Sequence, residues 1–273
     1  MMNARYLTAA LLLSLTTLPN CKQDDEAMTF GEAKQALEES QLTTQVSNLT
    51  STSVDISTHF TMGKAVEAAA AELRTFIETQ LPCAEVVLAK GTLDVTYGAK
   101  AGNCTYKGHS YSGSHSMTVA RNAEGDVEVD HAWTDLSNGV VSVSGSAEVT
   151  WSLAQGERHV HHALTWTRLS DGKQGAGSGD RTQSVLDGGL FEGIQIDGSR
   201  EWKSDGEQWD LAIDGVQVRW VDAVPQAGSY LLRSPRGKSL NLTFARADST
   251  TIQVKVSSGK RSFDFNVTTL PDE

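Results

Sequence analysis

Proline, aromatic residues and positive charge are all scarce in this chain of 273 residues. It contains only 5 prolines, 7% of its residues are aromatic, and 34 acidic side chains outnumber 23 basic ones. The formal net charge of −11 disfavours nucleic acid and anionic lipid headgroups as the main partners, and is typical of a protein kept soluble by its charge. Since 39% of the residues are hydrophobic, the chain can bury a substantial core.

Catalytic signatures are also missing from the sequence. It contains no Gly-x-Ser-x-Gly nucleophile elbow, no phosphate-binding loop and no His-Glu-x-x-His zinc motif. Seven histidines and many serines would allow a catalytic triad, but nothing in the order of the residues selects one. We therefore predict a protein that is not an enzyme and that carries no cofactor.

The first twenty residues have the pattern of a secretory signal. Arg5 supplies a positive start, and Tyr6 to Leu15 form an apolar run that is too short to span a bilayer comfortably. No Ala-x-Ala cleavage pattern follows this run. Instead, Leu18-Pro19-Asn20-Cys21 leads into the polar segment Lys22 to Glu26.

This arrangement resembles a bacterial lipoprotein signal, with Leu18 and Cys21 at the matching positions and Pro19 and Asn20 where small residues are usual. The resemblance implies cleavage after residue 20, acylation of Cys21 with palmitate as a typical fatty acid, and attachment to the membrane through that lipid. It also implies a place in the bacterial cell envelope, facing the periplasm or the cell surface. It covers about the first 25 residues only, and the alternative is a soluble secreted protein with a chance cysteine.

Cysteine counting agrees with the lipoprotein reading. The chain has 3 cysteines, so acylation of Cys21 leaves Cys83 and Cys104 as an even pair. In an oxidising compartment such a pair is expected to close into a disulfide, which would stabilise the fold by about 3 kcal/mol. Two free thiols in a cytosolic protein are the alternative.

Helical signals are confined to the region before Cys83. Thr29 and Glu32 have the spacing of a capping box and predict a short helix to about Ser40, within a tether that spans residues 21–60. The Ser- and Thr-rich segment that follows predicts extended chain, with an edge strand at Val54 and Ile56. Residues 61–82 predict an amphipathic helix, ended by Pro82, whose apolar stripe packs on a sheet. That stripe comprises Val66, Ala69, Leu73, Phe76, Ile77 and Leu81.

Short hairpins organise the rest of the chain. Loops at residues 123–125, 137–139 and 155–156 predict that Met117 pairs with His131, Trp133 with Val143, and Trp151 with Val160. All three registers place one apolar set on one face: Val119, Val127, Val129, Trp133, Val143, Val149, Trp151, Val160, Leu164 and Trp166. Polar residues gather on the other face: Ser116, Thr118, Glu128, Asp130, Thr134, Ser142, Ser144, Ser146 and Glu148. One dry and one wet face indicate an antiparallel sheet.

Similar turns continue to the end of the chain. A turn at residues 214–215 predicts pairing of Trp209 with Trp220, a loop at residues 235–237 pairs Leu232 with Leu240, and a turn at residues 258–259 pairs Val254 with Phe263. Residues 172–180 are Gly-rich and leave strand and loop both open. The fold class is therefore mainly β: an up-and-down meander of about a dozen strands at residues 84–270, curled open or barrel-like, in one domain spanning residues 61–273.

Two histidine groups are candidate metal ligands. His159 and His161 point the same way on a strand, and a second group joins His115, Met117 and His131 on the dry face. Each group alone lacks the further ligands that a zinc or copper site requires, so we expect solvated or packed histidines and no metal. A non-catalytic binding or structural lipoprotein is the main hypothesis. A metal-handling protein or metalloenzyme, and a carrier of a small apolar ligand, are the alternatives, and the sequence leaves a protein partner unspecified.

Overall fold

A computed structural model of the chain describes residues 26–56, 66–106, 108–152, 154–189, 192–219 and 221–269, except for the side chains of Asp55 and Ile56. The predicted leader and Cys21 lie outside these residues. The helices are α1 (Phe30–Ile56) and α2 (Val66–Gln80). The strands are β1 (Glu85–Ala89), β2 (Thr92–Tyr97), β3 (Thr105–Tyr106), β4 (His109–Ser110), β5 (Ser112–Arg121), β6 (Val127–Ser137), β7 (Val141–Ser152), β8 (Glu157–Arg168), β9 (Gln174–Val185), β10 (Gly193–Ser204), β11 (Glu207–Arg219), β12 (Ala227–Arg233), β13 (Ser239–Asp248), β14 (Thr251–Ser258) and β15 (Arg261–Thr268).

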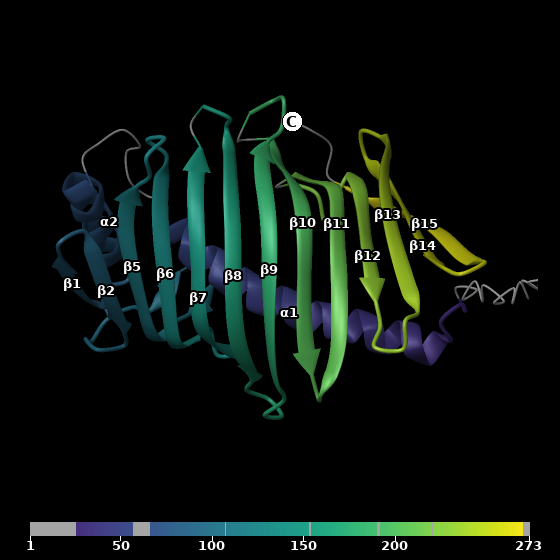
Figure 1. Cartoon of the computed structure of the whole chain (residues 1–273), viewed down its shortest axis with the longest axis horizontal. Helices are drawn as coiled ribbons and strands as arrows, with labels where there is room; N and C mark the ends of the chain where they lie inside the picture. Colours follow the sequence, from purple (N-terminus) through teal and green to yellow (C-terminus); the bar gives the residue numbers. More distant parts are fainter. Residues whose placement is uncertain are drawn as a thin grey trace, which may run out of the picture.

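Thirteen of these strands form one antiparallel sheet in the order β1-β2-β5-β6-β7-β8-β9-β10-β11-β12-β13-β14-β15, while β3 and β4 pair separately. Each strand lies beside its neighbour in the sequence, apart from the short β3–β4 excursion (Figure 1). The sheet is not closed, and β1 and β15 are its edges. The predicted up-and-down meander is confirmed, and it is an open curled sheet with two helices.

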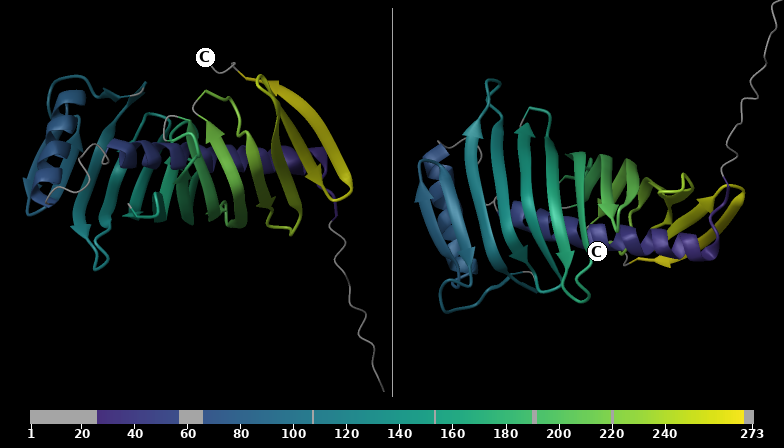
Figure 2. Two further views of the ribbon diagram at one scale, coloured as in Figure 1. Left: turned by 90° about the horizontal axis from the view of Figure 1, so that it is seen from above. Right: turned by 60° about the horizontal axis from the view of Figure 1, so that its bottom comes forward.

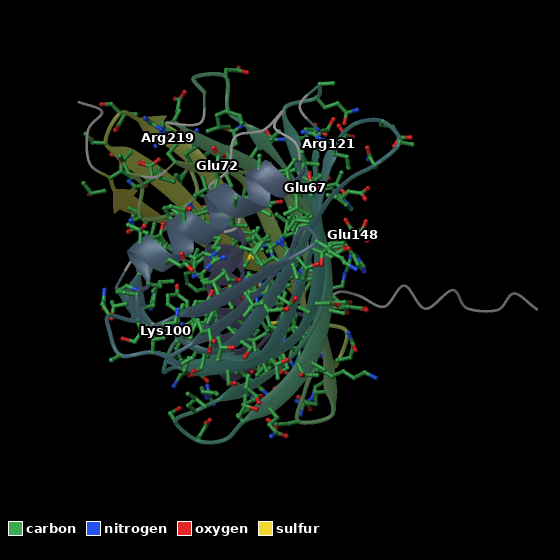
Figure 3. The ribbon with its side chains drawn as sticks, turned by 90° about the vertical axis from the view of Figure 1, so that its left-hand side faces the viewer. Glu67, Glu72, Lys100, Arg121, Glu148 and Arg219 are labelled. Atoms are coloured by element: carbon green, nitrogen blue, oxygen red, sulfur yellow. A yellow bond between two sulfur atoms is a disulfide. The ribbon has the colours of Figure 1, made fainter. Side chains whose placement is uncertain are left out.

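The two faces of the sheet are those that the sequence predicts. The apolar set is buried, from Val149 at 0% exposure to Leu164 at 6%, with only Trp151 half-buried. The polar set is exposed or half-exposed. We call the face that both helices cover the inner face and the opposite one the outer face. In Figure 3, Glu148 lies on the outer side of the curved sheet, and Glu67 and Glu72 of α2 lie on the inner side.

Helix α1 lies across the strands on the inner face (Figures 1 and 2). At its start the Met28 N–H donates to Ser258 Oγ in β14 (2.8 Å), and near its end Ser53 Oγ accepts from Trp133 Nε1 in β6 (3.0 Å). Its 27 residues span about 40 Å at 1.5 Å per residue. Eight strand spacings separate β14 from β6, or about 38 Å, so the helix length matches the width that it covers.

The long α1 corrects one prediction. The capping box is present, because the Thr29 N–H donates to Glu32 Oε2 (2.8 Å), but the helix does not end near Ser40 and no extended segment or edge strand follows. Hydroxyl groups inside the helix donate to carbonyls one turn back, as Thr44 Oγ1 does to Ser40 O (2.8 Å). These bonds satisfy the hydroxyls without ending the helix. Its buried side chains mix apolar and polar groups: Ala36, Glu39, Leu42, Thr43, Val46, Ser47, Leu49, Thr50, Ser53 and Val54. That mixture conceals the helical period.

Helix α2 and a disulfide complete the β1 edge. Four residues of the predicted stripe are buried (Ala69, Leu73, Ile77 and Leu81), and Val66 and Phe76 are half-buried. Helix α2 packs against β1, β2 and β5, and residues 61–65 of the predicted helix lie outside the described residues. The predicted bond between Cys83 and Cys104 is present, with Cα atoms 5.3 Å apart. It joins the end of α2 to the segment before β3.

The central registers are partly confirmed. Met117 pairs with His131 as predicted, but Trp133 pairs with Gly145 and Trp151 with Arg158. In β6–β7 the connection brings Ser137 opposite Ser142, three positions from the predicted register, and a bulge after Trp133, where Asp135 has a φ of 49°, reduces the shift to two. In β7–β8 a connection at residues 153–156 shifts the register by two. Because side chains alternate along a strand, a register shift of two residues leaves each side chain on the same face of the sheet. The predicted burial pattern is therefore right, although the predicted cross-strand partners are wrong.

Three further predictions concern the C-terminal strands. The loop at residues 235–237 is confirmed, with Leu232 opposite Leu240. The predicted turn at residues 214–215 is wrong, because β11 continues through these residues with a bulge. Trp209 pairs with Trp202 of β10, and its predicted partner Trp220 lies outside the described residues. The last turn lies one residue later than predicted, so Val254 faces Phe265 instead of Phe263. Residues 174–185 form strand β9, at the centre of the sheet.

Candidate functional site

The exposed histidine pair lies on the outer face beside an aspartate from the next strand. His159 Nε2 is 2.7 Å from Asp180 Oδ1, and His161 Nδ1 is 3.6 Å from Asp180 Oδ2. Strand alternation puts both histidines on one face, and the β8–β9 register brings Asp180 directly opposite His161. Because all three side chains are at least half exposed, water screens their charges, and each ion pair contributes little to stability.

The second histidine group is buried on the inner face. His115 Nε2 lies 2.9 Å from His131 Nδ1, and both rings stack on Trp133 at centroid distances of 5.4 and 5.5 Å. Met117 is fully buried beside them, at 0% exposure. The predicted proximity of these residues is confirmed. One nitrogen of each histidine is used in the hydrogen bond between the two rings.

Burial controls the protonation of this stack. It lowers the pKa of His131 to about 3, with Arg158 as a further cause, and it lowers the pKa of His115 well below its ordinary value, with His131 as a further cause. Both imidazoles are therefore neutral at pH 7, and one donates its N–H to the other. Within the described residues, no group of three or more His, Cys, Asp or Glu side chains is arranged to hold a metal ion.

The central outer face carries a hollow that the sequence analysis missed. Four adjoining depressions of about 460, 480, 410 and 290 Å³ cover strands β5 to β12, and each shares lining residues with another. We call this hollow the outer trough. Seven residues define its centre: Ser144, Ala163, Thr165, Ala176, Ser178, Glu201 and Lys203.

Small side chains account for the depth of the outer trough. Ala163, Thr165, Ala176 and Ser178 occupy neighbouring positions on β8 and β9, so no long side chain fills the middle of the sheet. Charged groups flank them, and Ser178 Oγ donates to Glu201 Oε1 (3.0 Å). The period-two run of small residues in β9 is the signal from which the trough could have been predicted.

Glycines on the opposite face of β9 serve a different purpose. Gly175, Gly177 and Gly179 face inward, and a Cβ atom there would approach Trp166 to 2.1 Å, Trp202 to 2.8 Å and His162 to 2.4 Å. The glycines therefore let these large side chains lie across β9. This close approach explains why a Gly-rich segment forms a regular central strand.

Under the middle of α1 the inner face is charged. Arg200 donates to Ser47 Oγ (2.7 Å) and Thr43 O (3.3 Å), while Lys173 forms a close ion pair with Glu39. Arg181 lies on the adjacent strand, opposite Val160. This cluster could not be predicted from the sequence, because its members come from α1, from β9 and β10 and from the connection before β9.

Comparison with known proteins gives no match to any family model, curated protein or solved structure. In the part of the chain that the structure describes, neither helix has the length and apolar character needed to cross a membrane.

Proposed function

We propose that this protein is a lipid-anchored lipoprotein of the bacterial cell envelope that binds a protein partner without catalysis. Acylated Cys21 would hold the sheet at the membrane, and the outer trough would receive the partner. The observation that carries the binding role is the trough itself, a continuous hollow across the central strands that is lined by small side chains and flanked by charged ones. Concave surfaces that combine apolar area with a few polar groups are the usual places for ligand recognition.

The position of α1 supports an orientation for this anchored protein. Cys21 precedes Glu26 by five positions, so the lipid would reach at most about 18 Å beyond the described chain. α1 begins beside β13 and β14, where Lys238 Nζ lies 2.9 Å from Glu32 Oε2. The β13–β15 end would therefore face the membrane, and the outer trough would lie along the side of the molecule.

The anchor is tested by the intact mass of protein extracted from membranes. The expected mass is that of residues 21–273 plus acyl groups, and it should increase by two hydrogens on reduction of the Cys83–Cys104 bond. A Cys21→Ala variant should be released into the soluble fraction. An unacylated mass in membrane-associated protein would refute the anchor.

The binding role is tested by photo-crosslinking in intact cells. A crosslinking amino acid at Thr165, in the outer trough, should give one discrete adduct that is lost in an Ala176→Trp background. The matched control is Thr243, an exposed threonine on the outer face of β13 outside the trough. Equal labelling at both positions, or adducts that survive the tryptophan substitution, would contradict a specific site.

A metal-handling role has one observation in its favour, the meeting of His159, His161 and Asp180. Stoichiometric metal in the purified protein that is lost on substitution of His159 and His161, or of His115 and His131, would replace the simple binding role with this one. The role of apolar-ligand carrier has less support, because α1 covers the inner face and would have to move away to open a cavity there.

A further inference from the structure

A row of small side chains crosses the outer trough from one strand to the next. Each member lies directly opposite the following one on the neighbouring strand, in the order Ser116, Ala132, Ser146, Ala163 and Ser178. At about 4.8 Å per strand spacing, this row is about 19 Å long, and the trough from β5 to β12 spans about 34 Å. About ten residues of extended chain have that length, whereas a metal ion or a small molecule would fill only part of it.

Acidic side chains border the row in two pairs. Asp130 and Glu148 lie directly opposite each other on β6 and β7, next to the row, and we call them the first acidic pair. Glu201 and Asp210 lie directly opposite each other on β10 and β11, where the row ends, and form the second acidic pair. Like charges directly opposite each other on neighbouring strands destabilise a sheet. Positions that break a local rule of stability are expected at functional sites, so two such pairs in one hollow favour a binding role.

Positive charge on the outer side of the trough is sparse. Of the lysines and arginines in the described chain, Lys203 and Arg233 line it from this side, and Arg233 lies opposite Asp210. Arg200 also borders the trough, but its guanidinium bonds to Ser47 of α1. No ion pair joins the first acidic pair to another described residue. The acidic side chains that line the trough are Asp130, Asp135, Glu148, Asp180, Glu201, Asp205 and Asp210. The trough is therefore complementary in charge to a cationic partner.

We propose that the outer trough binds an extended segment of a partner protein that is rich in lysine and arginine. This inference rests on the binding role proposed above and adds the chemistry of the partner. The segment would lie along the row of small side chains, where Ser116 and Ser146 offer hydroxyl groups to its backbone. Its cationic side chains would reach the two acidic pairs. Complementary charge of this kind selects the partner and speeds its association.

Binding of a fluorescein-labelled lysine peptide of about ten residues to the purified protein tests the charge requirement. Fluorescence anisotropy at a salt concentration of about 0.05 M should show saturable binding that weakens as salt is added. Asp130→Asn and Glu148→Gln together should weaken it by about threefold to tenfold. The matched control, Glu85→Gln with Asp264→Asn, changes the net charge equally at exposed positions on β1 and β15 and should bind as the wild type does. Equal affinities of the two double variants would overturn the proposal, because general attraction to an acidic protein would then explain the binding.

A substitution that leaves the charge unchanged tests the position of the peptide. Ala163→Trp places a large ring in the middle of the row and should weaken binding at least about tenfold, since it removes the space for the segment. The matched control is Thr243→Trp, on the outer face of β13 outside the trough, which should bind as the wild type does. Unchanged binding by Ala163→Trp would overturn the site. Spermine should bind far more weakly than the peptide, and an equal affinity would overturn the proposal in favour of a site for small cations.

Thermal unfolding separates a binding role of the first acidic pair from a structural one. The Asp130→Asn, Glu148→Gln double variant should have a Tm at or above that of the wild type, because it removes the repulsion between the two strands. A clearly lower Tm would show that the pair stabilises the fold and would contradict the proposal.

Crosslinking in cells distinguishes the failure of this inference from the failure of the proposed function. If the adduct at Thr165 forms but is unaffected by Asp130→Asn with Glu148→Gln, the trough binds a partner that is not basic, and only this inference fails. If the lysine peptide binds as expected but no adduct forms at Thr165, the proposed function fails and the preference of the trough for cationic segments stands.

Discussion

Helix α2 packs on the sheet at its β1 end and a disulfide ties the end of that helix down, whereas no helix of the described chain packs on β15 at the other end. β1 is only five residues long, and α2 packs behind it. β15 has eight residues, of which only Val267 is half-buried, and its Phe263 is 73% exposed. An uncovered strand edge can pair with another chain, so proteins usually shorten or cover it. The difference indicates that the β1 edge serves stability and that the β15 edge is available for contact.

The largest expected effect is at the covered edge. Leu73→Ala should lower the free energy of unfolding by about 2–5 kcal/mol, because it leaves a cavity between α2 and the sheet. Denaturant titration checks this loss. The matched control, Leu37→Ala on the exposed side of α1, should change stability far less. Equal losses would mean that α2 is not part of the cooperative core.

The disulfide should come next. Replacing Cys83 and Cys104 together with alanine should cost about 3 kcal/mol, since the bond restricts a loop with a sequence separation of 21 in the unfolded chain. Calorimetry of the variant, compared with the reduced wild type, checks the loss. If the variant and the reduced wild type both unfolded at the Tm of the oxidised wild type, the bond would contribute nothing to stability.

A smaller effect is expected at the open edge. Phe263→Ser and Phe265→Ser should change the free energy of unfolding by less than about 1 kcal/mol, because both rings are largely exposed. Self-association at high concentration, measured by light scattering, should nevertheless decrease, since these rings extend the apolar inner face beyond Val254 and Val256. Unchanged association would show that this edge is already protected.

The smallest effect is a pH dependence at the start of α1, near the open edge. The Thr29 backbone N–H, the Lys238 ammonium and the Thr29 hydroxyl lower the pKa of Glu32 from 4.5 to about 2. A lowered folded-state pKa means that this stabilisation is complete above about pH 4.5 and is lost as the pH falls toward 2. The Tm difference between wild type and Glu32→Gln should therefore disappear in acid. A difference that stays constant from pH 7 to pH 2 would contradict this role.

Which face each residue occupies could be predicted from the sequence, but which residues pair could not. Alternation along β5 to β8 fixes the faces, and any register error of two residues leaves them unchanged. The bulge after Trp133 depends on Asp135 adopting a positive φ and on Gly145 lying opposite, and neither requirement can be read from periodicity. The continuation of β11 through residues 214–215 could not be predicted either. Asp214-Gly215 is a common turn sequence, but here it forms a bulge within the strand.

The candidate sites depend on contacts between distant parts of the chain. The stack of His115, His131 and Trp133 was accessible to prediction because one hairpin register creates it. The outer trough was not, since it needs the lateral order of the strands from β5 to β12. The continuation of α1 beyond Ser40 was not predicted, because its buried side carries Ser and Thr beside Leu and Val, which removes the apolar stripe.

The path of α1 has a consequence for the order of folding. Its residues are synthesised before every strand of the sheet, yet Met28 bonds to Ser258, 230 positions later. Neighbouring strands can pair through short loops as soon as they emerge, whereas the surface that α1 covers is complete only when β14 is present. The helix therefore cannot complete its contacts with the sheet until β14 has been synthesised. Docking of α1 would follow strand pairing, and its apolar residues would be exposed until then.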